Sequence, residues 1–111
     1  MQTLPVEQFH PDLQEAVRRL VEHFQPVRIY LFGSRARGDA REHSDYDILV
    51  VVPDVQQSGF RAAQSAYSLL WGLELSIEVI VLTRTEFDRD LKYASSLPAT
   101  TTREGHVLYA A

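Results

Sequence analysis

Apolar residues recur along this chain of 111 residues with two different periods. From Pro11 to Phe24 they return every three or four positions, which is the spacing of one face of an α-helix and predicts an amphipathic helix. A second stripe with this spacing runs from Ala62 to Leu73 and predicts another helix. Short apolar runs bounded by proline or polar residues instead predict strands. These runs span residues 27–32, 46–52, 76–82 and 106–109.

Local signals give the ends of several of these elements. Pro26 follows the first helix, and Pro53 follows the strand 46–52. Thr83 and Glu86 have the spacing of a capping box and predict the start of a short helix. One more helical piece is expected over residues 99–104, before the last strand. Helices and strands therefore alternate, and the expected fold class is α/β.

The segment between the first two strands carries the clearest chemical signal. Gly33 and Ser34 directly follow the strand 27–32, so backbone amides at the start of a helical turn could hold phosphate oxygens there. Asp45 and Asp47 are two residues apart, and on a strand both side chains leave from the same face. Two carboxylates so placed can share Mg²⁺ ions, which neutralise phosphate charge. The segment predicts a site for a nucleoside triphosphate and its metal ions.

Glu78 is a third acidic residue of interest because it is isolated in the apolar strand 76–82. Consecutive strands joined by a crossover are usually neighbours, so Glu78 is expected beside Asp45 and Asp47. Three acidic residues are enough to anchor two metal ions that clamp the attacking and leaving oxygens of a displacement at phosphorus. A salt bridge to an arginine is the structural alternative for Glu78.

Several other residues also allow a structural interpretation. Gly33 and Gly38 can simply supply turns with positive φ. Arg35 and Arg37 are either solvated charges or partners of phosphate oxygens. The Ser34 hydroxyl either contacts a phosphate or caps the following helix. The aromatic residues on or near the second helix are expected to pack in the core. They are Phe60, Tyr67 and Trp71.

In order and spacing, these residues resemble the minimal nucleotidyltransferases, the small branch of the DNA polymerase beta-like nucleotidyltransferase superfamily. The matching positions are Gly33-Ser34, Gly38, Ser44-Asp45 and Asp47-Ile48-Leu49-Val50, with Ile77-Glu78-Val79 as the later acidic strand. The resemblance covers nearly the whole chain. It implies the polymerase beta-like fold, a small mixed sheet with helices packed on it, as a single domain over residues 1–111.

The resemblance also implies roles for individual residues. Asp45 and Asp47 would bind two Mg²⁺ ions, and Glu78 would be the third ligand and the candidate base. The implied nucleotide-binding residues are Gly33, Ser34, Arg35 and Ser44. Many relatives have Asp at the third acidic position, and Glu78 adds one methylene. Because a misplacement of about 1 Å can cost about 10²-fold in rate, the presence of Glu rather than Asp at position 78 is the feature that counts most against full activity.

The implied reaction transfers a nucleotide monophosphate, most often AMP from ATP, to a hydroxyl, with pyrophosphate as the other product. Many members of this branch are antitoxins encoded with a HEPN-domain ribonuclease, and some attach AMP to a tyrosine of that partner. The expected partners are therefore ATP or another nucleoside triphosphate and a HEPN-domain toxin. Two alternatives remain open. One is a catalytically weak module that neutralises a toxin by complex formation, and the other is a transferase acting on a small-molecule or RNA hydroxyl.

Composition narrows the class of partner. The formal net charge is -4, and Lys92 is the only lysine among eleven basic residues, so nucleic acid is not the expected partner. There is no cysteine, which excludes disulfides and thiolate zinc sites. No apolar run approaches about 18 residues, so no membrane association is expected. The expected location is the cytoplasm.

Overall fold

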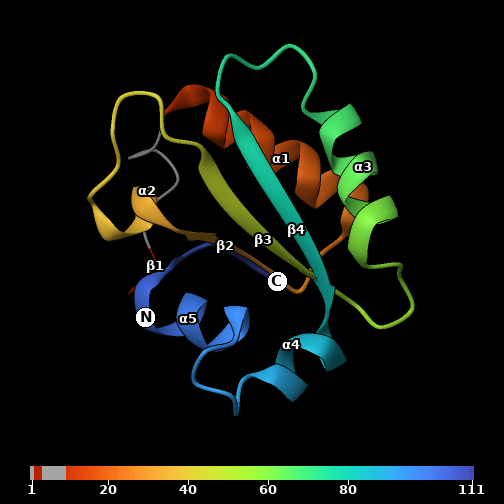
Figure 1. Ribbon diagram of the computed structural model, residues 1–111. Helices are drawn as coiled ribbons and strands as arrows, with labels where there is room; N and C mark the ends of the chain where they lie inside the picture. The colour runs from red at the N-terminus through yellow and green to blue at the C-terminus, as the bar shows by residue number, and fades with distance from the viewer. Residues whose placement is uncertain (1, 4–9) are drawn as a thin grey trace.

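The computed structural model describes residues 2–3 and 10–111. The strands of this part are β1 (Gln2–Thr3), β2 (Arg28–Phe32), β3 (Tyr46–Val52), β4 (Ile77–Thr83) and β5 (His106–Ala110). Its helices are α1 (Pro11–Phe24), α2 (Ser34–Arg37), α3 (Gly59–Leu69), α4 (Arg84–Asp90) and α5 (Leu97–Glu104). The strands form one sheet with the order β1-β5-β2-β3-β4, and helices lie on both of its faces (Figure 1).

The sheet is mixed, as the resemblance implies. β3 and β4 are parallel neighbours, and Asp47 pairs in register with Glu78. β2 is antiparallel to both β3 and β5, whereas β1 is parallel to β5. The crossover through α3 makes the β3–β4 pair possible, because parallel neighbours need a long connection. The expectation that the strand bearing Glu78 lies beside the strand bearing Asp47 is confirmed.

The two faces of the sheet have separate apolar clusters. α1 and α3 cover one face, where Leu13 and Leu20 of α1 pack with strand residues that include Ile48 and Val50. α4 and α5 lie over the other face (Figure 1). The buried residues of that second cluster are Tyr30, Leu49, Val51 and Phe87. The carboxylates of Asp47 and Glu78 lie on this second face, because strand side chains alternate.

The helix α3 differs from the prediction in position and in what it buries. It covers residues 59–69 rather than 62–73, and residues 70–76 form the loop that leads into β4. Only two alanines of the helix are buried, Phe60 and Tyr67 of the helix remain exposed, and Trp71 lies in the loop that follows it. The exposed fractions are 77% for Phe60, 45% for Tyr67 and 86% for Trp71. The prediction that these aromatic residues pack in the core is therefore wrong.

No helix in the described part of the chain is long and apolar enough to cross a membrane.

Candidate active site

Asp47 and Glu78 form the centre of the candidate site. They are paired in the parallel register of β3 and β4, which places their side chains next to each other on one face of the sheet. Asp47 is half-buried, whereas Glu78 is exposed to solvent. No ion pair within residues 2–3 and 10–111 involves Glu78, so the described structure does not show the arginine salt bridge that was its structural alternative.

The electrostatic environment of Asp47 disfavours its negative charge. Burial raises the pKa of the Asp47 carboxyl, and the negative charges of Glu78 and Asp45 raise it further. The charge of Arg37 acts in the opposite direction but has the smallest effect. Converging carboxylates repel one another, and the repulsion is relieved when a cation or a proton binds between them.

Asp45 lies directly before β3 and accepts a hydrogen bond from Ser76, a residue that the sequence analysis did not predict as part of the site. The Ser76 hydroxyl donates a hydrogen bond of 2.5 Å to Oδ1 of Asp45. Ser76 directly precedes β4, and the amide of Tyr46 donates to its carbonyl at 2.9 Å. When the Asp47–Glu78 register is extended back by two residues, Ser76 falls opposite Asp45. Ser76 could therefore be recognised only once the pairing of the two strands was known.

Gly33 lies against the carboxylate of Asp47. Its φ is +73°, and a Cβ atom at this position would lie 2.1 Å from Oδ2 of Asp47. Glycine is needed here both for the positive φ and for the close approach of the backbone to the carboxylate. Gly38 also has a positive φ, of +86°, but a Cβ atom there would meet nothing within 4 Å. The two glycines of the motif thus have different roles.

Ser34 is the first residue of α2, and Gly33 occupies the N-cap position without a side-chain hydrogen bond. The amides of Ala36 and Arg37 donate to the Gly33 carbonyl. Within the described residues, no acceptor is bonded to the amides of Ser34 and Arg35. The Ser34 hydroxyl therefore does not cap α2, and its contact with a phosphate stays a prediction.

Arg35 and Ser44 stabilise the loop that carries Asp45. The Arg35 guanidinium donates to the carbonyls of Ser44 and Glu42 at 3.0 to 3.2 Å and lies 4.6 Å from the ring centroid of Tyr46. The Ser44 hydroxyl accepts from the amide of Arg41 at 2.8 Å. These contacts give both residues a positioning role, and their contact with a nucleotide stays a prediction.

A divalent cation fits the donors of this site by their chemistry. Carboxylate oxygens are the hard ligands that Mg²⁺ prefers. Within the described residues, no group of three acidic or histidine side chains is arranged to hold an ion as it stands. One oxygen of Asp45 is bonded to Ser76, whereas its Oδ2 has no hydrogen-bond partner in the described structure. Asp47, Glu78 and this Oδ2 are the groups that would hold a cation.

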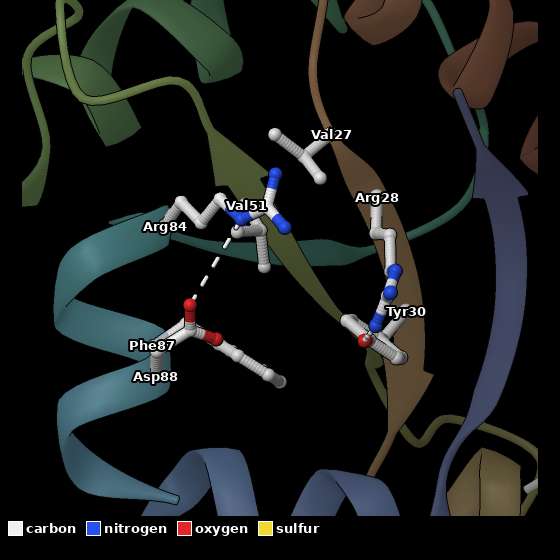
Figure 2. A pocket seen from close by; sticks show the side chains of 7 residues that line it. All are labelled: Val27, Arg28, Tyr30, Val51, Arg84, Phe87 and Asp88. Atoms are coloured by element: carbon white, nitrogen blue, oxygen red, sulfur yellow. Dashed lines mark hydrogen bonds and ion pairs between the residues drawn. The ribbon is translucent and has the colours of Figure 1, made fainter.

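Two hollows lie near the sheet, and they differ in size and position. One, of about 350 Å³, lies beside Asp45 and is also lined by Ser76, His43 and Glu74. The other is a cleft of about 40 Å³ between α4 and β2, which Figure 2 shows from close by. Its polar groups are already paired: Arg28 donates to the Tyr30 hydroxyl, and Arg84 faces Asp88. A space this small holds about one water molecule, so the cleft is not the nucleotide site.

Acidic residues on neighbouring strands beside a glycine turn define a phosphate-transfer class of site. The chain belongs to the nucleotidyltransferase domain family, whose model matches residues 13–102. This confirms the family resemblance that the motif indicates. No curated protein matches the chain.

Three solved structures have a fold similar to that of this chain. A proposed nucleotidyltransferase from Sulfolobus solfataricus is 29% identical with a TM-score of 0.57, over 76% of this chain and 75% of that one. A mutant of the toxin-antitoxin complex MntA-HpeT is 22% identical with a TM-score of 0.57, over 86% and 69%. A toxin-antitoxin structure with AMP-PNP is 21% identical with a TM-score of 0.60, over 92% and 75%. The latter two show likeness of fold.

Proposed function

We propose that this nucleotidyltransferase transfers AMP from ATP to a hydroxyl of a partner protein, and that this partner is the HEPN-domain toxin of a toxin-antitoxin pair. The observation that carries the proposal is the pairing of Asp47 with Glu78 on neighbouring strands beside Gly33, with Asp45 two residues earlier in the chain. The toxin-antitoxin structures of similar fold, one of them with AMP-PNP, support the choice of partner and nucleotide.

In the proposed reaction, the acceptor hydroxyl oxygen attacks the α-phosphorus of ATP and forms a new phosphorus–oxygen bond. The bond from the α-phosphorus to the oxygen that bridges it to the β-phosphorus breaks, and pyrophosphate leaves with that oxygen. Glu78, which is exposed beside Asp47, accepts the proton of the attacking hydroxyl. Two Mg²⁺ ions, when bound by Asp45, Asp47 and Glu78, supply charge stabilisation to the phosphate oxygens.

The other residues of the proposed site bind and orient the nucleotide. The Ser34 hydroxyl and the amides at the start of α2 offer donors for phosphate oxygens. Arg37 is exposed, and its charge reaches the carboxylate of Asp47. A charge-assisted contact between Arg37 and a phosphate would supplement the metal ions.

Labelled ATP tests the proposal. The purified chain is incubated with Mg²⁺, the HEPN-domain protein of the adjacent gene, and ATP labelled on either the α- or the γ-phosphate. We expect the α-label on the partner and the γ-label in pyrophosphate, with transfer at least 100-fold slower for Asp47→Asn. The matched control is Asp88→Asn, which alters an exposed aspartate of α4 beside the small cleft and should transfer normally. A γ-label on the partner, or no label, would refute AMP transfer.

One observation favours a second candidate, a module that neutralises the toxin by binding alone. The three carboxylates do not form a ready metal cluster within the described structure. The double variant Asp45→Ala with Asp47→Ala separates the two functions. An enzyme loses its ability to neutralise the toxin, whereas a steric inhibitor keeps it.

A further inference from the structure

The loop between α3 and β4 exposes a large aromatic side chain next to the candidate site. Trp71 is the only tryptophan of the sequence, and 86% of its surface is exposed. The same loop ends at Ser76, which holds Asp45, and continues into the strand that carries Glu78. In Figure 1 this loop and the loop before β3 lie at the same end of the sheet.

The backbone of this loop is hydrogen-bonded to side chains of α1, although the Trp71 side chain is exposed. Arg19 donates to the carbonyls of Leu69 and Trp71 at 2.9 and 3.1 Å. The carboxylate of Asp12 accepts from the amide of Glu74 at 2.8 Å. An aromatic side chain on a fixed backbone loses little conformational freedom when it is covered, which is the property of an anchor residue in a protein interface.

Trp71 borders an apolar groove that adjoins the hollow beside Asp45. The groove has a volume of about 460 Å³, and we call it the Trp71 groove. It is lined by Tyr67, Trp71, Leu73, Leu75 and Ile77, among others. Leu75 also lines the hollow beside Asp45 and Ser76, so the groove and the hollow are neighbours. The groove lies on the α1/α3 face, whereas the carboxylates of Asp47 and Glu78 lie on the other face of the sheet. A protein that reaches the carboxylates over the end of the sheet where β3 and β4 begin would cover the groove at Leu75.

The charges next to the groove define the chemistry of the partner surface. Glu74 and Glu42 both line the hollow and are exposed. Neither carboxylate has an ion pair in the part of the chain that the structure describes. The nearby Arg35 guanidinium is already bonded to backbone carbonyls. The complementary surface therefore combines an apolar patch for Trp71 with lysine or arginine for these two glutamates.

We propose that the Trp71 groove is the docking surface for the acceptor protein, which places an apolar patch on Trp71 and basic side chains on Glu74 and Glu42. This inference rests on the proposed function, because it takes the acceptor to be a protein. It adds to that function the surface by which the acceptor is recognised and oriented.

The fluorescence of Trp71 tests the groove in the unmodified chain. The HEPN-domain protein of the adjacent gene is added, and emission and acrylamide quenching are recorded as differences from the Trp71→Phe variant, which removes the signal of the partner's own tryptophans. We expect a blue shift and at least threefold weaker quenching when the complex forms. A complex that leaves both quantities unchanged would overturn the groove assignment. Protection of Trp71 in the chain alone at rising concentration would assign the groove to a second copy instead.

Variants then measure how much the groove contributes. We expect Trp71→Ala to weaken complex formation at least tenfold, because tryptophan anchors dominate interface energies. The reversal Glu74→Lys should weaken it further and remove part of its salt dependence. The matched control is Phe60→Ala, since Phe60 is 77% exposed on α3 but does not line the groove. Equal effects of the Trp71 and Phe60 variants would refute the proposal.

Binding and transfer are measured on the same samples, so failures of the two proposals can be told apart. A complex that buries Trp71 without transfer of label would support the groove and refute the transferase. Transfer of label that is unaffected by Trp71→Ala would support the transferase and refute the groove. If the two proteins form no complex, both the acceptor partner and its docking surface are refuted.

Discussion

Gly33 shows how closely the turn and the acidic strand depend on each other. Its positive φ and its contact with Asp47 both exclude a side chain. We expect Gly33→Ala to lower the free energy of unfolding by about 1–3 kcal/mol, as strained backbone conformations do. We also expect it to displace the Asp47 carboxylate and weaken Mg²⁺-dependent nucleotide binding by at least tenfold. Chemical denaturation and calorimetry measure the two effects.

Gly38→Ala is the matched control for that variant. Gly38 has a similar φ, of +86°, but open space where its Cβ would lie. It should therefore lose stability from backbone strain while it binds nucleotide normally. If both variants bind nucleotide equally well, the contact between Gly33 and Asp47 does not shape the site.

Asp47 should reduce the stability of the metal-free protein. Its pKa is raised above the ordinary value of 3.8, so the folded state disfavours the charged carboxyl. Stability is therefore lost as pH rises through the raised pKa, and Asp47→Asn avoids that loss. Without metal, we expect the variant to melt at a higher temperature than the unmodified chain at pH 7. The gain should disappear below pH 3.8, and a gain that persists there would contradict this account.

Ser76 is predicted to position Asp45 for metal binding. Loss of a hydrogen bond behind a metal ligand commonly costs about 10- to 100-fold in metal affinity or activity. We expect Ser76→Ala to raise the Mg²⁺ concentration needed for half-maximal activity by this factor, and Ser76→Thr to restore most of it. A merely structural hydroxyl would instead change the melting temperature and leave the Mg²⁺ dependence unaltered.

The sequence predicted the acidic residues of the candidate site but not the residues that support them. Asp45 and Asp47 stood out by their spacing on one strand, and Glu78 stood out by its isolation in an apolar run. The contact of Ser76 with Asp45 depends on the pairing of β3 with β4. The bonds of Arg35 depend on the path of the loop 38–45. Neither of these is encoded in local spacing.

For helices and strands, the sequence predicted an element's ends correctly where a proline or a capping residue marks them. α1 has its predicted bounds, with proline in the first turn, and the capping box of Thr83 and Glu86 is present at the start of α4. The prediction that Phe60, Tyr67 and Trp71 pack in the core was wrong, because hydrophobicity alone does not tell which side of a helix meets the sheet. The position of β5 between β1 and β2 joins distant parts of the chain and has no local signal.

The start of α4 is also tied to the end of β3 by Asp54. Its carboxylate accepts from the amide of Thr85 at 2.9 Å and from the Thr85 hydroxyl at 2.6 Å. These bonds hold the pKa of Asp54 below its ordinary value of 3.8. A lowered folded-state pKa contributes stability above the unfolded value, and this stability is lost as pH falls through the folded pKa.

The pH dependence of Asp54→Asn checks this link. We expect the variant to be less stable than the unmodified chain above about pH 4, by an amount that stays constant to neutral pH. The difference should shrink as pH falls below 3.8, since the unmodified carboxyl then takes up its proton. Urea denaturation at a series of pH values measures it. A difference that does not change with pH would show that the charge of Asp54 has no part in holding α4.

For the molecule as a whole, the parallel pairing of β3 and β4 brings together residues that lie 31 positions apart in the chain, Asp47 and Glu78. The same pairing places the α3–β4 loop, with Trp71 and Ser76, at the edge of the site. One arrangement of two strands therefore sets the acidic cluster, its support and the proposed docking groove. The fold tolerates repulsion among the carboxylates because a cation is expected to relieve it.

Calorimetric titration of ATP in the presence and absence of Mg²⁺ tests this account most directly, because it requires neither the acceptor nor turnover. The account predicts that one ATP binds per chain with Mg²⁺, that EDTA abolishes binding, and that Asp47→Asn and Glu78→Gln each weaken it at least tenfold while Asp88→Asn does not. Equal binding of ATP in EDTA, or undiminished binding by both acidic-site variants, would contradict it.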